Sequence, residues 1–81
     1  MSDFEASAET EAVNMVEDVD AEIDTVHDGV GDPFFTVVLK SGTLDECRLA
    51  ECRRWGFNVA DVTVREEGVA ITFLFTGRPI N

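Results

Sequence analysis

The two cysteines are the first residues that could do chemistry, as thiol nucleophiles, disulfide partners or metal ligands. Cys47 and Cys52 are five residues apart in a segment with strong helical signals. Five residues of an α-helix turn by about 140° and rise by about 7.5 Å, which places the Cα atoms beyond the ~7 Å that a disulfide can bridge. A structural zinc site needs four ligands, and the chain adds only one histidine to these thiols. We therefore interpret both cysteines as small buried hydrophobic residues.

The histidine and the acidic run before it could supply a general base or a cation site. His27 stands next to Asp28, but no serine or cysteine is tied to this pair by a motif, so nucleophilic catalysis is not supported. Carboxylates alternate along 18–24, yet a calcium loop needs Gly at its sixth position and Glu at its twelfth, where Ile23 and Gly29 stand. The glycines form no nucleotide-binding motif. We interpret His27 as a surface turn or strand-end residue, and we expect no catalytic residue, no cofactor and no metal.

Basic and aromatic side chains gather at one place in the chain. They are Arg48, Arg53, Arg54 and Trp55. Such residues could contact nucleic acid, but that function needs a coherent basic face, and two glutamates of the same segment interleave with the arginines. These four residues are therefore candidate interaction residues, with a protein surface favoured over nucleic acid as their partner.

A helix at about 44–55 must position these arginines and cysteines. Thr43 and Glu46 form a capping box at its start, and Gly56 stands where a helix-ending residue needs the left-handed conformation. Acidic residues fall in the first turn and arginines in the last, as the helix dipole favours. The apolar residues of this segment lie on more than one side, so we expect a second contact, with an N-terminal helix or another subunit.

Three segments rich in β-branched and aromatic residues surround this helix, at 34–40, 57–65 and 69–76. The short link with Gly68 predicts a hairpin between the last two. The apolar residues of 57–65 alternate in two different phases, which a bulge or a late start of the strand near Ala60–Asp61 would reconcile. The last segment is apolar on nearly both sides, which favours the middle of the sheet. A right-handed crossover through the helix makes 34–40 and 57–65 parallel, with the last strand antiparallel to both. This order is similar to half of a ferredoxin-like fold.

The N-terminal third of the chain carries two conflicting patterns. Apolar residues from Phe4 to Val26 recur every three or four positions, as on one face of a helix, with Ser2 and Glu5 as a capping box. Polar and apolar residues alternate from 18 to 25, as in a half-buried strand. We favour a helix in roughly the first half and a strand at about 19–26.

These elements predict an α+β fold with two layers. The sheet is mixed, with three or four strands in the order (β)-β-α-β-β, one helix at about 44–55 and an N-terminal helix. We divide the chain into an acidic N-terminal segment at 1–17, helical or flexible, and a single α+β domain at 18–81. The order ββαββ resembles the β-grasp, the ubiquitin-like fold. Sulfur carriers of that fold end in Gly-Gly, whereas this chain ends in Gly77-Arg-Pro-Ile-Asn81, so their carrier function is not implied.

The charge of the chain is placed unevenly. The 81 residues carry a formal charge of −11, and residues 1–32 hold 11 of the 17 acidic groups and no Lys or Arg. Abundant acids and a single lysine resemble the composition of halophilic archaeal proteins, whose carboxylates hold water and whose repulsion is screened by salt. The alternative is an acidic N-terminal arm in a mesophilic protein. No secretory signal or membrane-spanning run is recognised, so we expect a soluble cytoplasmic protein.

These observations favour a non-enzymatic protein-interaction or self-association module adapted to high salt. Several apolar residues at 34–38, together with Phe57, would need cover on the face of the sheet away from the helix. So small a domain gains stability by association, which makes a homodimer the leading hypothesis. The alternative is a nucleic-acid- or translation-associated accessory protein that uses the arginine-containing helix.

Overall fold

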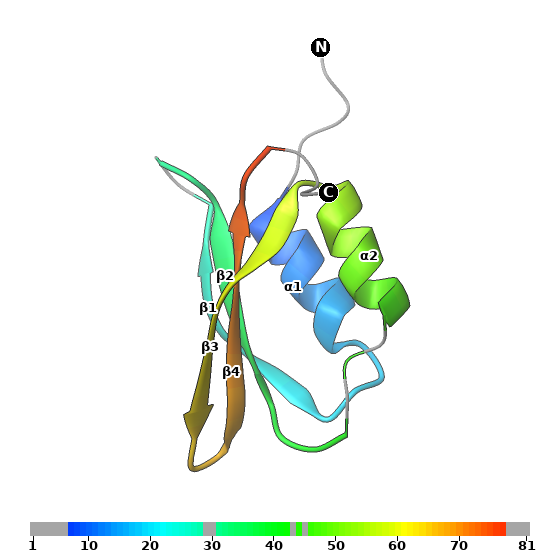
Figure 1. Ribbon diagram of the computed structural model, residues 1–81, viewed down its shortest axis with the longest axis vertical. Helices are drawn as coiled ribbons and strands as arrows, with labels where there is room; N and C mark the ends of the chain where they lie inside the picture. Colours follow the sequence, from blue (N-terminus) through cyan, green and yellow to red (C-terminus); the bar gives the residue numbers. More distant parts are fainter. Residues whose placement is uncertain (1–6, 29–30, 43, 45, 78–81) are drawn as a thin grey trace.

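The computed structural model describes residues 7–28, 31–42, 44 and 46–77. It is an α+β fold of two helices and four strands (Figure 1). The elements are α1 (Ala8–Val16), β1 (Ala21–His27), β2 (Phe34–Leu39), α2 (Glu46–Arg54), β3 (Phe57–Arg65) and β4 (Gly68–Phe75). The order β-β-α-β-β after an N-terminal helix confirms the predicted fold class, and α1 and β1 resolve the two conflicting patterns of the N-terminal third.

The strands form one sheet in the order β1-β2-β4-β3. β4 lies between β2 and β3 and is antiparallel to both, as its apolar composition predicts. β1 is also antiparallel to β2. The sheet is therefore antiparallel at every pairing rather than mixed. β2 and β3 do run in the same direction, but β4 separates them, so no parallel hydrogen bonds form between them.

A bulge in β3 sets which side chains share a face. In the pairing with β4, Ala60 is passed over between Val59 and Asp61. An extra residue of this kind reverses the alternation of a strand. Val62 and Val64 therefore face the same side as Val59, which confirms the predicted bulge.

Both helices cover the same face of the sheet, side by side, and the hydrophobic core lies between the layers (Figure 1). The core joins residues from both helices and three strands: Ala8, Ala12, Met15, Phe35, Val37, Cys52, Phe57 and Phe73. The stacked rings of Phe35 and Phe73, 4.8 Å apart, form its centre. α1 supplies the second contact predicted for α2.

Two side chains cap the start of α1. Ser7 is the N-cap residue, and its hydroxyl accepts a hydrogen bond from the Thr10 amide at 3.3 Å. The carboxylate of Asp28, just beyond β1, accepts from the amides of Ala8 at 2.8 Å and Glu9 at 3.0 Å. These donors have no partner within the helix, so Asp28 ties the helix to the end of the strand. The capping box predicted at Ser2 and Glu5 lies outside the described residues.

The end of α2 follows the prediction. Gly56 has φ of 95°, the left-handed conformation expected of a residue just past a helix. A Cβ atom there would lie 2.6 Å from Cε1 of Phe75, so close packing also requires glycine. Thr43 of the predicted capping box lies outside the described residues. Neither described helix is long and apolar enough to cross a membrane.

The face of the sheet away from the helices is covered by its own side chains. Thr36, Val38 and Ala70 are buried there. Above this row, Arg65 of β3 and Asp24 of β1 form an ion pair at 3.4 Å, although they belong to opposite edge strands. The sheet must curve for these side chains to meet. The prediction that Phe35, Val37 and Phe57 need cover on this face is wrong, because these residues face the helices and belong to the core. Val38 does lie on the far face, where it is buried within the chain itself.

Candidate functional site

Arg48 joins the two helices. Its Nη1 atom donates to the carbonyl oxygen of Asn14 at 2.7 Å and lies 3.5 Å from that of Met15. Both carbonyls are in the last turn of α1, where backbone oxygens lack partners and the helix dipole is negative. Arg48 therefore has a structural role, as a cap on α1.

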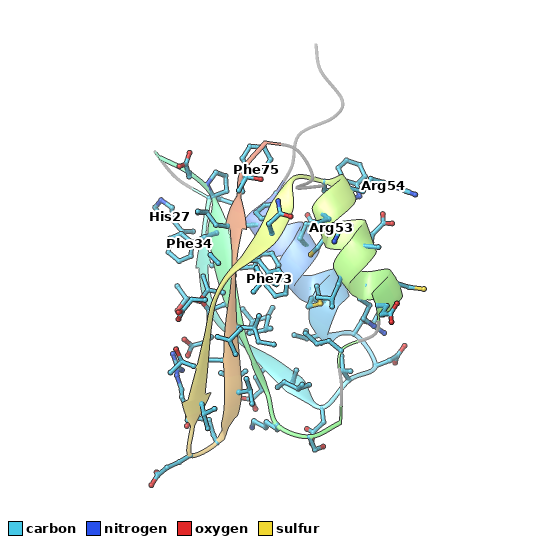
Figure 2. The ribbon with its side chains drawn as sticks, viewed as in Figure 1. His27, Phe34, Arg53, Arg54, Phe73 and Phe75 are labelled. Atoms are coloured by element: carbon cyan, nitrogen blue, oxygen red, sulfur yellow. The ribbon has the colours of Figure 1, made fainter. Side chains whose placement is uncertain are left out.

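Two of the other candidate interaction residues, Arg54 and Trp55, meet around Glu51 at the end of α2. The Trp55 indole donates from Nε1 to Glu51 Oε2 at 2.9 Å, and Arg54 Nη1 is 3.5 Å from Glu51 Oε1. Arg53 is exposed, and Arg54 extends away from the end of the helix (Figure 2). A carboxylate thus lies at the centre of the cluster, which interrupts any basic surface that could follow a phosphate backbone.

The two cysteines have different surroundings. Neither forms a disulfide; Cys47 is exposed and Cys52 is buried. The interpretation as buried hydrophobic residues is confirmed for Cys52 and wrong for Cys47, which lies on the solvent side of α2. Burial and the nearby carboxylate of Glu11 raise the pKa of Cys52 to about 12. The Cys52 thiol therefore stays protonated at neutral pH, and it is the thiolate that acts as nucleophile or metal ligand.

A small cavity lies between the helices. Its volume is about 60 Å³, and its lining consists of Glu11, Asn14, Met15, Arg48, Glu51 and Cys52. Sites for small molecules have volumes of roughly 300–1,000 Å³. This cavity is therefore too small to hold a substrate or cofactor.

His27 ends β1, which confirms the prediction of a strand-end residue. Its ring stacks on Phe34, with centroids 5.3 Å apart, on the side of the sheet opposite the helices (Figure 2). The neighbouring Asp28 serves the first amides of α1. The histidine and the acid thus have separate structural contacts.

The carboxylates of the acidic run take up separate partners. Asp20 accepts from the Ser41 hydroxyl at 2.7 Å, and Glu22 pairs with Lys40 at 2.7 Å. Asp24 is paired with Arg65 across the sheet. Within the described ranges, no group of three or more metal-ligating side chains could hold an ion.

The most distinctive surface of the molecule is apolar and belongs to β3. Val59, Val62 and Val64 are exposed at 51%, 57% and 81%; we call them the β3 valine row. The pairing with β4 places them on the face that the helices cover elsewhere. Beyond its first two residues, however, β3 is exposed throughout, and the β3–β4 hairpin extends past both helices (Figure 1).

The β3 valine row also lies on an open edge. Among the strands that the structure describes, β3 is the last of the sheet and pairs only with β4. An edge strand presents unpaired backbone N–H and C=O groups that can template another strand. A row of exposed valines on such an edge can therefore offer another chain both hydrogen bonds and apolar area.

The sequence did not single out this row as a site. Its alternating valines match a strand whose apolar face is covered, and periodicity does not distinguish a covered strand from an uncovered one. The sequence does hold one signal of this exposure, the short length of the predicted helix. About 12 helical residues span only ~18 Å, so they cannot cover a four-stranded sheet.

Comparison of the chain with protein-family models, with curated proteins and with solved structures gives no match.

Proposed function

We propose that this protein is a non-enzymatic self-association module of a cytoplasm with high salt, and that the β3 valine row is its contact surface. The observation that carries the proposal is the exposure of three valines in line on an open edge strand. Contiguous exposed apolar surface of this kind is typical of sites of protein association.

The energetics support this use of the row. Fully burying a valine side chain contributes about 1.5–3 kcal/mol relative to leaving it exposed, and a symmetric contact buries each residue twice. An 81-residue chain buries a smaller share of its surface on folding than larger domains do. Association would therefore add stability that the small core lacks.

High salt fits the same proposal. Each copy carries a charge of −11, so two copies repel at low ionic strength. At about 1 M salt the Debye length falls to ~3 Å, and this repulsion is largely screened. The acidic composition would thus permit association where salt is high.

Nucleic-acid binding is the less supported function. Arg48 donates to the carbonyl oxygens of α1, and Arg54 is paired with Glu51. Phosphate binding needs several available cations, and these contacts reduce the number that α2 can offer.

Sedimentation equilibrium at about 1 M salt tests the proposal. The double substitution Val62→Thr and Val64→Thr keeps β-branched side chains but replaces a methyl group with a hydroxyl. We expect this variant to dissociate with a Kd at least about tenfold higher than the unmodified protein, since tenfold corresponds to ~1.4 kcal/mol.

The matched control is Val13→Thr on α1, because Val13 is exposed to a similar degree, at 51%. This substitution should leave the Kd unchanged. A strictly monomeric unmodified protein at millimolar concentration would overturn the proposal, as would an equal effect of the two substitutions.

A further inference from the structure

The two open edges of the sheet differ in their ability to pair with a second copy. β1 carries Glu22 and Asp24 and has no lysine or arginine, so pairing β1 with itself would bring carboxylates together. The last five residues of β3 are Asp61-Val-Thr-Val-Arg65, with one acid and one base. They follow the bulge at Ala60 as a regular run. Only β3 therefore has an edge whose charges could balance in a symmetric pair.

This five-residue run is complementary to itself about its middle residue. Antiparallel pairing about a two-fold axis at Thr63 places Asp61 opposite Arg65 of the second copy, and the reverse contact follows by symmetry. Val62 then lies opposite Val64 of the second copy. Opposite charges and β-branched residues are both favourable as directly facing cross-strand pairs.

We propose that two copies of this chain pair edge to edge through Asp61–Arg65, antiparallel and centred on Thr63, to form one continuous eight-stranded sheet. This inference rests on the proposed self-association and specifies its partner, strand and register. A shift of this pairing by one residue would place each valine opposite a residue from the other face of the second copy's sheet. The register is therefore strongly specified.

The faces of the sheet support this arrangement. Val62 pairs with Ile71 and Val64 with Val69 in the β3–β4 register, so the valines lie on the helix-covered face. A second copy would bring its own two valines alongside them on the same face. Four valines would then form one apolar strip that continues onto the partly buried residues of β4.

The charged residues lie on the other face and are accessible. The Asp61 carboxylate accepts a hydrogen bond from the Thr63 hydroxyl at 2.9 Å. Arg65 contacts Asp24 at 3.4 Å and Glu67 at 3.8 Å through Nη1, and its side chain is 37% exposed. The contact with Asp24 directs the Arg65 side chain toward the opposite edge strand. In the dimer Arg65 would therefore exchange Asp24 for Asp61 of the second copy.

Symmetric cysteine cross-linking tests the register. In a Cys47→Ser background, which removes the exposed native thiol, Thr63→Cys places one thiol at the two-fold axis. Directly opposite residues have Cβ atoms about 4.5–5.5 Å apart, near the range of a disulfide. The control is Ala60→Cys on the same exposed strand, whose two copies would lie six residues, or about 20 Å, apart along the edge.

We expect mild oxidation at about 1 M salt to convert Thr63→Cys to a covalent dimer at least about tenfold faster than Ala60→Cys. If the unmodified protein associates but Thr63→Cys cross-links no faster than the control, this register is wrong while the proposed self-association stands. If the unmodified protein is monomeric, both the register and the proposed self-association are wrong.

A mixing experiment tests the charge pairs without a new thiol. Asp61→Arg alone places two arginines opposite each other, and Arg65→Asp alone places two aspartates opposite each other. A mixture of these variants restores both opposite-charge pairs in the heterodimer. We expect each variant alone to associate about tenfold more weakly than the unmodified protein, and the mixture to form heterodimers in preference to either homodimer. Random mixing of the variants would overturn the inference even if Thr63→Cys failed to fold.

Discussion

Glu11 is an acidic side chain in an apolar position. It is only 5% exposed and lies in the contact between α1 and α2, where the Cys52 thiol approaches its Oε1 atom at 3.8 Å. Desolvation by burial raises the pKa of Glu11, and the nearby charge of Glu51 raises it further, while the hydrogen bond from Cys52 lowers it. The folded protein therefore holds the Glu11 proton more tightly than the unfolded chain does.

This shift has a defined effect on stability. At low pH Glu11 is protonated in both the folded and the unfolded chain, so the raised pKa does not change the free energy of unfolding. As the pH rises above 4.5, the ordinary value, the unfolded chain ionises more readily than the folded protein, so stability falls until Glu11 is ionised in both states. We expect Glu11→Gln to raise the Tm at pH 8 by a few degrees, since about 1 kcal/mol shifts the Tm of so small a domain by ~4–8 °C.

Thermal unfolding followed by circular dichroism at pH 8 and at pH 3.5 measures this difference. The gain should largely disappear at pH 3.5, where Glu11 is protonated in both states. Glu9→Gln, an exposed change on the same helix, should give no comparable gain. A Glu11→Gln variant less stable than the unmodified protein at pH 8 would contradict the burial argument.

At the scale of elements, the turn between α2 and β3 is held by backbone hydrogen bonds on both sides. The amide of Gly56 donates to the Arg53 carbonyl at 2.9 Å, and its own carbonyl accepts from the Thr76 amide at 2.7 Å. The turn is thus bonded to the helix before it and to the residue after β4. These hydrogen bonds hold α2 against the sheet and also stabilise the reversal of the chain between α2 and β3.

Gly56→Ala should therefore destabilise the fold more than the same change at another turn. Gly42 also has a positive φ, 81°, but a Cβ there meets nothing within 4 Å. We expect Gly42→Ala to cost about 1 kcal/mol, the usual strain of this conformation. Gly56→Ala adds a clash with the Phe75 ring and should cost about 2–4 kcal/mol. Urea denaturation measures both, and equal costs would show that the ring gives way freely.

The helices and strands also differ in how far the sequence could predict them. The left-handed Gly56, the bulge at Ala60 and the central place of β4 were all predicted, because each follows from residue types within a few positions of one another. The partners of Arg48 and Asp28 were not, since these residues bond to a helix 34 and 20 positions away. Local patterns carry no information on contacts over such separations.

The candidate site was harder to predict for a related reason. The valines of β3 were recognised as strand residues, but their exposure depends on how far two nine-residue helices reach across the sheet. Cys47 and Cys52 show the same limit on a smaller scale. Both lie on one helix, and only the position of α1 determines that one of them is buried.

At the scale of the whole molecule, 11 of the 17 acidic residues lie within residues 1–32; those that the structure describes there are spread over α1, β1 and the turns beside them. The acidic segment 18–28 forms a turn and β1 rather than a helix, so its acids do not form like-charge pairs along a helix. Repulsion therefore acts between elements and opposes the compact state as a whole. Salt should act on global stability in the same way.

We expect the Tm and the helical circular dichroism signal near physiological temperature to rise between about 0.05 M and 2 M sodium chloride, as screening shortens the Debye length from above 10 Å to below 3 Å. A variant with Glu9, Glu17 and Asp18 neutralised to the corresponding amides removes three exposed acids and should respond less to salt. Unchanged signals across this range would contradict both the repulsion argument and the proposed adaptation to high salt.

The order of strands also determines how the chain can fold. β1 with β2 and β3 with β4 are hairpins of neighbouring segments, whereas the β2–β4 pairing encloses α2 and β3. Closing this larger loop carries the greater entropic cost, and pairings of high sequence separation limit the folding rate. Each hairpin leaves one edge of an apolar strand, β2 or β4, without a partner strand until the two halves join. We therefore expect the pairing of β2 with β4 to be the rate-limiting step of folding.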